Sequence, residues 1–225
     1  MSQAADSADV IVQLRRLCDK AVLSLPAAGA GLTVSAKESR YGLVAAADPA
    51  SERLEELQFV LGEGPCIDAS ASRRPVLVAS LGYDGPSRWP LYTSAAQEFG
   101  VRAVFAFPLQ VGAAQIGVMD FFRTREGGLS DPELGRAFEM ADEAVAILLD
   151  GPGPSGPQTD PGPADGELAG PTELFQAQGM VMVQTGGTLA EAMARIRAYA
   201  YAEDLRLTDV ARAIVDRRLR FNRDG

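Results

Sequence analysis

Two neighbouring stretches of the sequence read VRAVFAFPLQVG (residues 101–112) and QIGVMDFFRT (residues 115–124). Valine, isoleucine and the aromatic residues favour strands, so these stretches predict two long strands. Helical patterns lie on both sides of them along the chain. The amino-terminal part therefore predicts an α+β fold, in which an antiparallel sheet is flanked by helices.

The other elements of this part are predicted from hydrophobic spacing and from helix-end signals. A first helix carries an apolar stripe from Val10 to Leu25, and two strand-like runs follow at residues 32–38 and 40–48. A helical stretch ends at Gly62, residues 75–80 predict a strand, and residues 89–100 predict a helix. The last helix starts at a capping box of Ser130 and Glu133. Its predicted inward stripe contains Leu134, Phe138, Ala141, Val145 and Leu148.

A segment rich in proline and glycine divides the chain. Residues 151–171 contain six glycines and six prolines, and Leu168 is their one large apolar side chain. Such a segment buries too little apolar surface to offset the entropy of ordering its backbone, so it predicts a flexible linker. The predicted organisation is a first domain at residues 1–150, a linker at residues 151–171 and a second domain at residues 172–225.

Composition restricts the classes of function. The 225 residues are 47% hydrophobic and 23% charged, as in ordinary globular proteins, and no apolar run is long enough to span a membrane. The chain contains no histidine, which excludes histidine triads, HExxH zinc sites and histidine-ligated haem. Cys18 and Cys66 match no zinc-ligand spacing. We therefore expect a cytoplasmic protein that is not an enzyme, has no membrane segment and uses no metal or other cofactor.

The segment LGEGPC (residues 61–66) is a glycine-rich loop that could bind phosphate. It lacks the lysine and the Ser/Thr of a phosphate-binding loop, and no helix clearly begins after it. A loop whose glycines need positive φ is the favoured interpretation. Its cysteine, Cys66, has the acidic sequence neighbours Glu63 and Asp68, which would raise the pKa of a thiol. A structural cysteine is therefore expected.

Four aromatic residues of the first domain could line a small-molecule pocket between the sheet and its helices: Tyr41, Phe59, Trp89 and Tyr92. Each of them stands at a spacing that suits a helix or a strand. Taken singly, each is favoured as a core residue instead. The pocket and the core interpretations both stay open from the sequence.

Three helical patterns and a cluster of arginines mark the second domain. Thr188 and Glu191 form a capping box at the start of the second helix. Residues 206–223 hold six arginines against two aspartates, in a chain whose formal net charge is −9. A solvated helix face or nucleic-acid contact would explain this cluster, and Tyr199 and Tyr201 could stack on bases. The residues expected to face inward are Leu174, Ala177, Val181, Met182, Leu189, Ala192, Ile196, Tyr199, Ala200, Leu207, Val210, Ala211 and Ile214.

The second domain resembles the ANTAR domain, a three-helix RNA-binding module of bacterial transcription antiterminators. The resemblance lies in the run QAQGMVM (residues 176–182) and in residues that follow it: Thr188, Ala192, Arg197, Ala200, Arg206, Leu207, Asp209, Val210 and Ala211. The first domain, with LGEGPC ahead of PVLVAS, resembles the GAF domains that are fused to ANTAR in actinobacterial regulators.

This resemblance implies a signal-responsive regulator that binds a stem-loop RNA as a homodimer and prevents a terminator hairpin from forming. The GAF-like domain would bind an unidentified small molecule or a partner. The residues expected at the RNA interface are Ala177, Gln178, Gly179, Arg197, Tyr201, Arg206 and Arg212.

Two positions depart from the ANTAR pattern. Family members usually carry a basic residue where this chain has Gln178, and often an asparagine near Asp204. Loss of a cation and gain of an anion both weaken phosphate contact. These departures favour an alternative, a GAF-like small-molecule or protein-interaction sensor whose carboxyl-terminal helices mainly dimerise.

Overall fold

A computed structural model of the chain describes the backbone of residues 2–36, 40–150 and 169–222. Its internal contacts separate two units, Met1–Gly162 and Pro163–Gly225. Most of the predicted linker, residues 151–168, lies outside the described residues, and the helix that follows it begins at Ala169. The limits and the flexibility of the linker therefore stay predictions.

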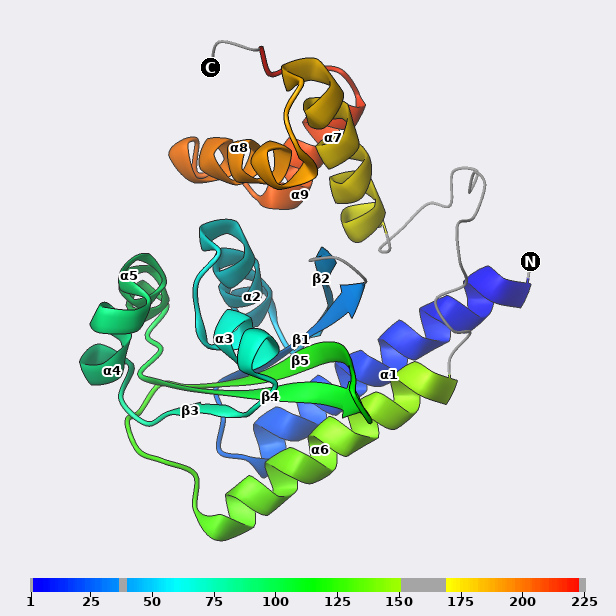
Figure 1. Cartoon of the computed structure of the whole chain (residues 1–225). Helices are drawn as coiled ribbons and strands as arrows, with labels where there is room; N and C mark the ends of the chain where they lie inside the picture. Colours follow the sequence, from blue (N-terminus) through cyan, green and yellow to red (C-terminus); the bar gives the residue numbers. More distant parts are fainter. Residues whose placement is uncertain (1, 37–39, 151–168, 223–225) are drawn as a thin grey trace. The chain divides into compact units, whose positions relative to one another are not determined.

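Five antiparallel strands form the sheet of the first unit, in the order β2-β1-β5-β4-β3 (Figure 1). The two long strands predicted from composition are β4 (Ala103–Val111) and β5 (Ala114–Arg123), and β5 is the central strand. β1 (Gly29–Ala36) pairs with β5 and β2 (Arg40–Ala46), while β3 (Val76–Val78) pairs with β4. The antiparallel sheet is confirmed.

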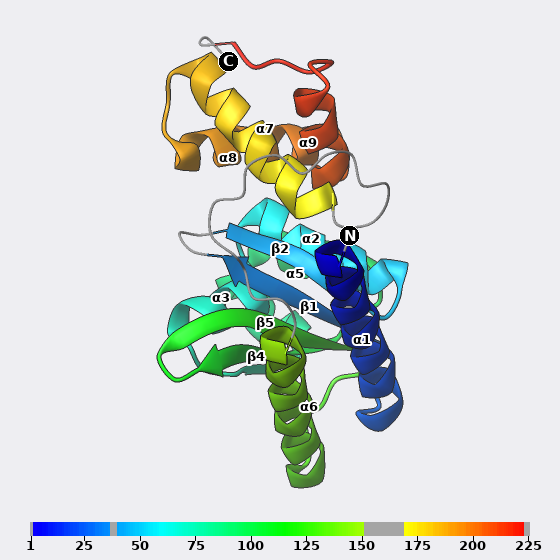
Figure 2. The same cartoon turned by 90° about the vertical axis from the view of Figure 1, so that its right-hand side faces the viewer.

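Helices cover both faces of this sheet (Figures 1 and 2). One face packs against α1 (Ser2–Ser24) and α6 (Asp131–Asp150). The other packs against α2 (Pro49–Leu61), α3 (Pro65–Ser72), α4 (Leu81–Arg88) and α5 (Pro90–Glu98). The predicted α+β class, a sheet flanked by helices, is therefore confirmed.

The strand residues divide between the two faces because successive side chains of a strand point to opposite sides. Phe105 and Phe121 pack against α1 and α6, whereas Val104 and Phe122 pack against the helices of the other face. Asp120 follows the same alternation. It lies between Val118 and Phe122 on the α2–α5 face, where the sequence pattern would place another apolar residue.

Two short helices, α3 and α4, are not predicted by the sequence patterns. The expectation that no helix begins after LGEGPC is wrong, because Pro65 opens α3 behind the N-cap residue Gly64. In α4, two glycines and Pro86 lower the intrinsic helix propensity. The helix is held instead by the buried Leu81 and by the packing of Gly85 against Thr93.

The inward face of α6 also differs from the prediction. Phe138, which was expected to face inward, is 46% exposed, while Ala137, Met140 and Ala144 are buried. The small alanines let the helix approach the sheet closely. The ring of Phe138 packs edge-on against Phe107 at the border, with ring centroids 5.1 Å apart. Apolar spacing gives the period of the helix but leaves its rotation about the axis undecided.

Three helices form the second unit: α7 (Ala169–Thr185), α8 (Leu189–Ala202) and α9 (Leu207–Val215). This confirms the predicted all-α domain, and the capping box of Thr188 and Glu191 is present. Leu189, expected to face inward, is 42% exposed at the start of α8. The buried core contains Leu174, Ala177, Val181, Ala192, Met193, Ile196, Ala200, Leu207, Val210, Ala211 and Ile214.

Candidate ligand site and nucleic-acid interface

The aromatic residues expected to line a pocket are buried wherever their side chains are described. Trp89 and Tyr92 are 1% and 0% exposed, and Phe59 is 9% exposed. Tyr41 lies in β2, and its side chain is outside the described residues. The structure brings Trp89 and Tyr92 together in the core cluster under α4 and α5. Their Nε1 and hydroxyl groups are buried and have no hydrogen-bond partner among the described residues.

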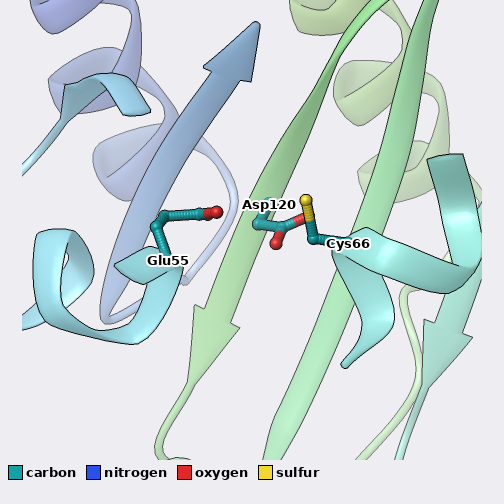
Figure 3. Close-up of side chains that lie close together, drawn as sticks. All are labelled: Glu55, Cys66 and Asp120. Carbon is teal, nitrogen blue, oxygen red and sulfur yellow. The ribbon is translucent and has the colours of Figure 1, made fainter. Parts of the chain in front are cut away.

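Sequence reasoning missed a polar cluster that is buried between the sheet and helices α2 and α3 (Figure 3). Thr33 of β1, Glu55 and Gln58 of α2, Cys66 of α3 and Asp120 of β5 form it, and each is at most 5% exposed. Asp120 gave a signal in the sequence, since it is the one acid in the apolar run GVMDFF. Glu55 and Gln58 gave none, because polar residues of a helix are ordinarily assigned to its solvent face.

Gln58 organises this cluster with both ends of its amide. Its Nε2 donates to Asp120 Oδ2 over 2.6 Å, and its Oε1 accepts from the backbone N–H of Cys66 over 2.8 Å. Thr33 Oγ1 donates to Glu55 Oε2 over 3.2 Å and lies 3.5 Å from Cys66 Sγ. Glu55 Oε1 and Asp120 Oδ1 remain buried without a hydrogen-bond partner among the described residues.

Burial shifts the titration of these groups, because the charged form of an acid loses its hydration in the interior. Burial raises the pKa of Asp120 to about 7, although the hydrogen bonds with Gln58 and with the carboxyl group of Glu55 act in the opposite direction. Burial, and then the charge of Asp120, raises the pKa of Glu55 well above its usual value. The same two causes raise the pKa of the Cys66 thiol. Without a cation, the two carboxyl groups therefore share protons at neutral pH.

Glycines make room for the cluster. A Cβ at Gly31 would lie 2.5 Å from Glu55 Cγ, and one at Gly64 would lie 2.5 Å from Gln58 Oε1. Gly62 and Gly64 have φ of 70° and 141°, which confirms that the LGEGPC loop needs positive φ at its glycines. Glu63 of this loop accepts from the backbone N–H groups of Leu91 and Tyr92, so the loop caps α5.

In the second unit, the residues expected from the QAQGMVM run face different ways. Ala177 is fully buried in the helical core, so its side chain contacts the neighbouring helices and not solvent. Gln178 donates from Nε2 to the backbone carbonyl of Leu189 over 2.8 Å, which joins α7 to the start of α8. A Cβ at Gly179 would meet open space, so no neighbouring helix requires a glycine there.

The remaining expected RNA contacts lie on α8 and α9. Tyr201 is 57% exposed at the last turn of α8, and Arg206 is exposed at the N-cap of α9. Arg197 stands one turn before Tyr201 and is half-buried, and burial lowers the pKa of its guanidinium. Arg212 is exposed but pairs with Glu173 of α7, with 3.5 Å between Nε and Oε2.

The expected interface residues thus form two groups. Gln178 contacts Leu189 at the first turn of α8, whereas Tyr201 lies at its last turn. Twelve residues of helix separate these positions, which is about 18 Å along the axis. A contact surface that includes both groups would have to extend along the length of α8.

Asp204 has a conformational role that the sequence comparison with ANTAR did not reveal. Its φ is 49°, in the left-handed region, at the turn between α8 and α9. Asparagine and aspartate tolerate this region better than other residues with a side chain. Aspartate in place of asparagine therefore preserves the turn while it changes the local charge.

The chain matches family models of two regulatory classes. GAF domains are sensor domains, and ANTAR domains are RNA-binding antitermination modules. The GAF domain model matches residues 7–149 and the ANTAR domain model matches residues 167–215. The chain therefore belongs to the GAF family and carries an ANTAR domain after its GAF domain, as the motifs predict. The resemblance to the actinobacterial type stays a prediction.

Solved structures show the same fold in the first unit. The GAF domain region of a protein from Geobacter sulfurreducens PCA superposes with a TM-score of 0.53 at 14% identity, over 66% of this chain and 99% of that chain. The type II free methionine-R-sulfoxide reductase from Thermoplasma acidophilum gives a TM-score of 0.49 at 14% identity, over 63% and 94% of the two chains. At these identities the first likeness shows the fold alone, and the second supports no inference.

Comparison with curated proteins found no match. In the part of the chain that the structure describes, every helix is too short or too polar to cross a membrane.

Proposed function

We propose that this protein is a signal-responsive regulator that binds a stem-loop RNA through its ANTAR domain and acts by transcription antitermination. The observation that carries the proposal is the exposure of Tyr201 and Arg206 on either side of the α8–α9 turn. An aromatic ring can stack on an unpaired base and a guanidinium can bind phosphate. Together they provide the two kinds of contact that a hairpin loop needs.

In this proposal the protein works in the cytoplasm as a homodimer and catalyses no reaction. Each chain presents one ANTAR domain, so a dimer binds two hairpins of one transcript. The GAF domain binds a small ligand, and binding of that ligand changes the affinity for RNA. The acidic first domain, with 20 acidic against 13 basic residues up to position 150, would repel RNA and leave binding to the second domain.

The test is a titration of the full chain against an RNA with two hairpins, and against an RNA of equal length without hairpins. We expect tighter binding to the hairpin RNA and an affinity that falls as salt rises, because bound phosphates release counterions. Equal binding to both RNAs, or binding that salt does not weaken, would contradict the proposal.

Arginine variants, titrated with the same RNA as the unchanged chain, test whether individual cations contribute to the RNA affinity. Arg206→Ala should weaken binding, while Arg206→Lys, which keeps the charge, should retain most of it. Arg212→Ala should also weaken binding, because it removes a second exposed cation of this domain. All three variants should unfold at the temperature of the unchanged chain.

A second candidate function is a sensor whose carboxyl-terminal helices serve mainly to dimerise. The outer face of α7 favours it, because the apolar side chain of Val183 is 76% exposed there. Sedimentation of a Val183→Glu variant tests this function. A dimer that this change converts to a monomer, in a chain that retains no RNA, would support the sensor over the RNA-binding regulator.

A further inference from the structure

Three potential metal ligands meet in the buried cluster of the GAF domain. They come from three elements: Glu55 from α2, Cys66 from α3 and Asp120 from β5. One carboxylate oxygen of each acid and the Cys66 sulfur all lie within 4.8 Å of one another. Figure 3 shows Glu55 directed toward Asp120 from one side and Cys66 beside Asp120 on the other.

The cluster lacks a partner for its negative charges. Among the described residues, no nitrogen or hydroxyl group donates to Glu55 Oε1 or Asp120 Oδ1, and the Tyr92 hydroxyl is a third polar group without a partner. Through these oxygens the two carboxyl groups can hydrogen-bond only to each other, and only when one of them is protonated. No lysine or arginine in the described part of the chain forms an ion pair with Glu55 or Asp120. Tyr92 is close enough for the charges of both acids and of Cys66 to raise its pKa, after burial as the main cause. Buried anionic groups are costly unless they are paired or bind a cation.

Neighbouring residues already hold the ligands in place. Gln58 binds Asp120 through Oδ2, which leaves Oδ1 available, and Thr33 binds Glu55 through Oε2, which leaves Oε1 available. Cys66 is the second residue of α3, and its backbone N–H donates to Gln58, which fixes the start of this helix beside Asp120. Residues that orient metal ligands by hydrogen bonds are a regular feature of metal sites.

We propose that Glu55, Cys66 and Asp120 bind a divalent transition metal ion of borderline softness, zinc or ferrous iron. A thiolate selects against magnesium and calcium, which need six or more oxygen ligands, and two carboxylates select against copper(I). Three protein ligands leave a coordination position open, as in zinc sites that bind a further molecule. Donor atoms around such an ion lie about 3.3–3.8 Å apart, so the side chains need to close by about 1 Å.

This proposal deepens the sensory half of the proposed function, because it names the class of ligand that the GAF domain binds. It does not depend on the RNA interface, and its test contains no RNA. The metal-site proposal and the RNA-binding proposal can therefore fail independently. Since all three ligands are buried, we expect the ion to bind as the domain folds and to exchange slowly afterwards.

The test uses the full chain, unfolded with a chelator and refolded with cobalt(II), zinc or ferrous iron under anaerobic conditions, or with magnesium. Cobalt(II) is the probe, because a cobalt–thiolate bond gives a charge-transfer absorption that carboxylates do not give. We expect this absorption at one cobalt ion per chain and its loss on addition of zinc. Magnesium should produce no binding.

Cysteine variants identify the thiolate. Cys18 is also buried, but it packs with α1 and α6 on the opposite face of the sheet, so Cys18→Ser is the matched control. Cys18→Ser should keep the absorption, whereas Cys66→Ser should lose it and bind zinc about 100-fold more weakly or worse. Asp120→Asn should lower the affinity while it keeps the absorption.

Two results would overturn the proposal. One is a refolded, unchanged chain that shows no cobalt–thiolate absorption and no bound zinc or iron, in which case the two carboxyl groups share a proton and nothing more. The other is a Cys66→Ser chain that keeps the absorption. The measurement on the unchanged chain decides the matter even if Cys66→Ser does not fold.

Discussion

The two faces of the GAF sheet treat buried charge in opposite ways. On the α1–α6 face, Arg123 is 4% exposed and pairs with Glu133, with 2.8 Å between Nη2 and Oε1. On the α2–α5 face, Glu55 and Asp120 are equally buried but have no cation beside them among the described residues. The first arrangement is complete in itself, whereas the second needs a proton or a metal ion.

We infer that the buried charges on the α1–α6 face stabilise the fold, whereas those on the α2–α5 face do not. Glu133 accepts from the backbone N–H of Ser130 as well as from Arg123. The same carboxylate therefore pairs with Arg123 and caps the amino terminus of α6. Such a group stabilises the fold. Two buried acids with no cation beside them in the described part of the chain lose hydration on folding, so we expect the Glu55–Asp120 pair to add little to the stability of the fold. Substitutions at four positions test this difference between the faces. Their expected effect on the free energy of unfolding decreases from Phe121 through Gly31 and Glu133 to Asp120.

Phe121→Ala should have the largest effect. Its ring is 1% exposed on the α1–α6 face and packs edge-on against Phe107, with centroids 5.6 Å apart. Loss of the ring should lower the free energy of unfolding by about 3–5 kcal/mol, measured by urea denaturation. A loss below 1 kcal/mol would mean that this face is not the stabilising one.

Gly31→Ala should cost about 1–3 kcal/mol of unfolding free energy, since its Cβ would have to displace the Glu55 side chain. Gly128→Ala is the control, because a Cβ there meets open space. If Glu55 simply moves away, Gly31→Ala and Gly128→Ala will have equal stability, and the cluster is then loosely held.

Glu133→Gln should cost about 1–2 kcal/mol at neutral pH, because it removes the charge that pairs with Arg123. The backbone N–H of Ser130, and then the neighbouring hydroxyl and Arg123, lower the pKa of Glu133. A lowered pKa gives stability that is complete above the unfolded value, near 4.3, and is lost as the pH falls through the folded value. The difference between the two chains should therefore be constant from pH 7 to pH 5 and shrink below about pH 4. A difference that grows toward low pH would contradict this account.

Asp120→Asn should have the smallest effect on the metal-free chain, less than about 1 kcal/mol in urea denaturation. The new amide can still accept from Gln58 and can donate to the unpartnered oxygen of Glu55. A loss of several kcal/mol would show that the carboxylate is structural, and the contrast between the faces would then disappear.

Local patterns predicted much of this molecule. The strand composition of residues 101–124 and the capping box of Thr188 and Glu191 depend on residues close in the chain, and both are present. The motif around Gly179 identified the ANTAR domain, although the same run included the buried Ala177 among the expected RNA contacts. A motif names a family, but it does not say which of its side chains face solvent.

Other features could be known only from the folded chain. The rotation of α6 that exposes Phe138 depends on how closely the alanines approach the sheet, and α4 forms against its own propensity because Leu81 is buried. Glu55, Cys66 and Asp120 stand far apart in the sequence and match no ligand spacing. The sequence by itself determined the class of each domain and most of its helices and strands, because these follow from interactions between residues a few positions apart. Tertiary structure alone decided which acids lie together, because that depends on where α2, α3 and β5 pack.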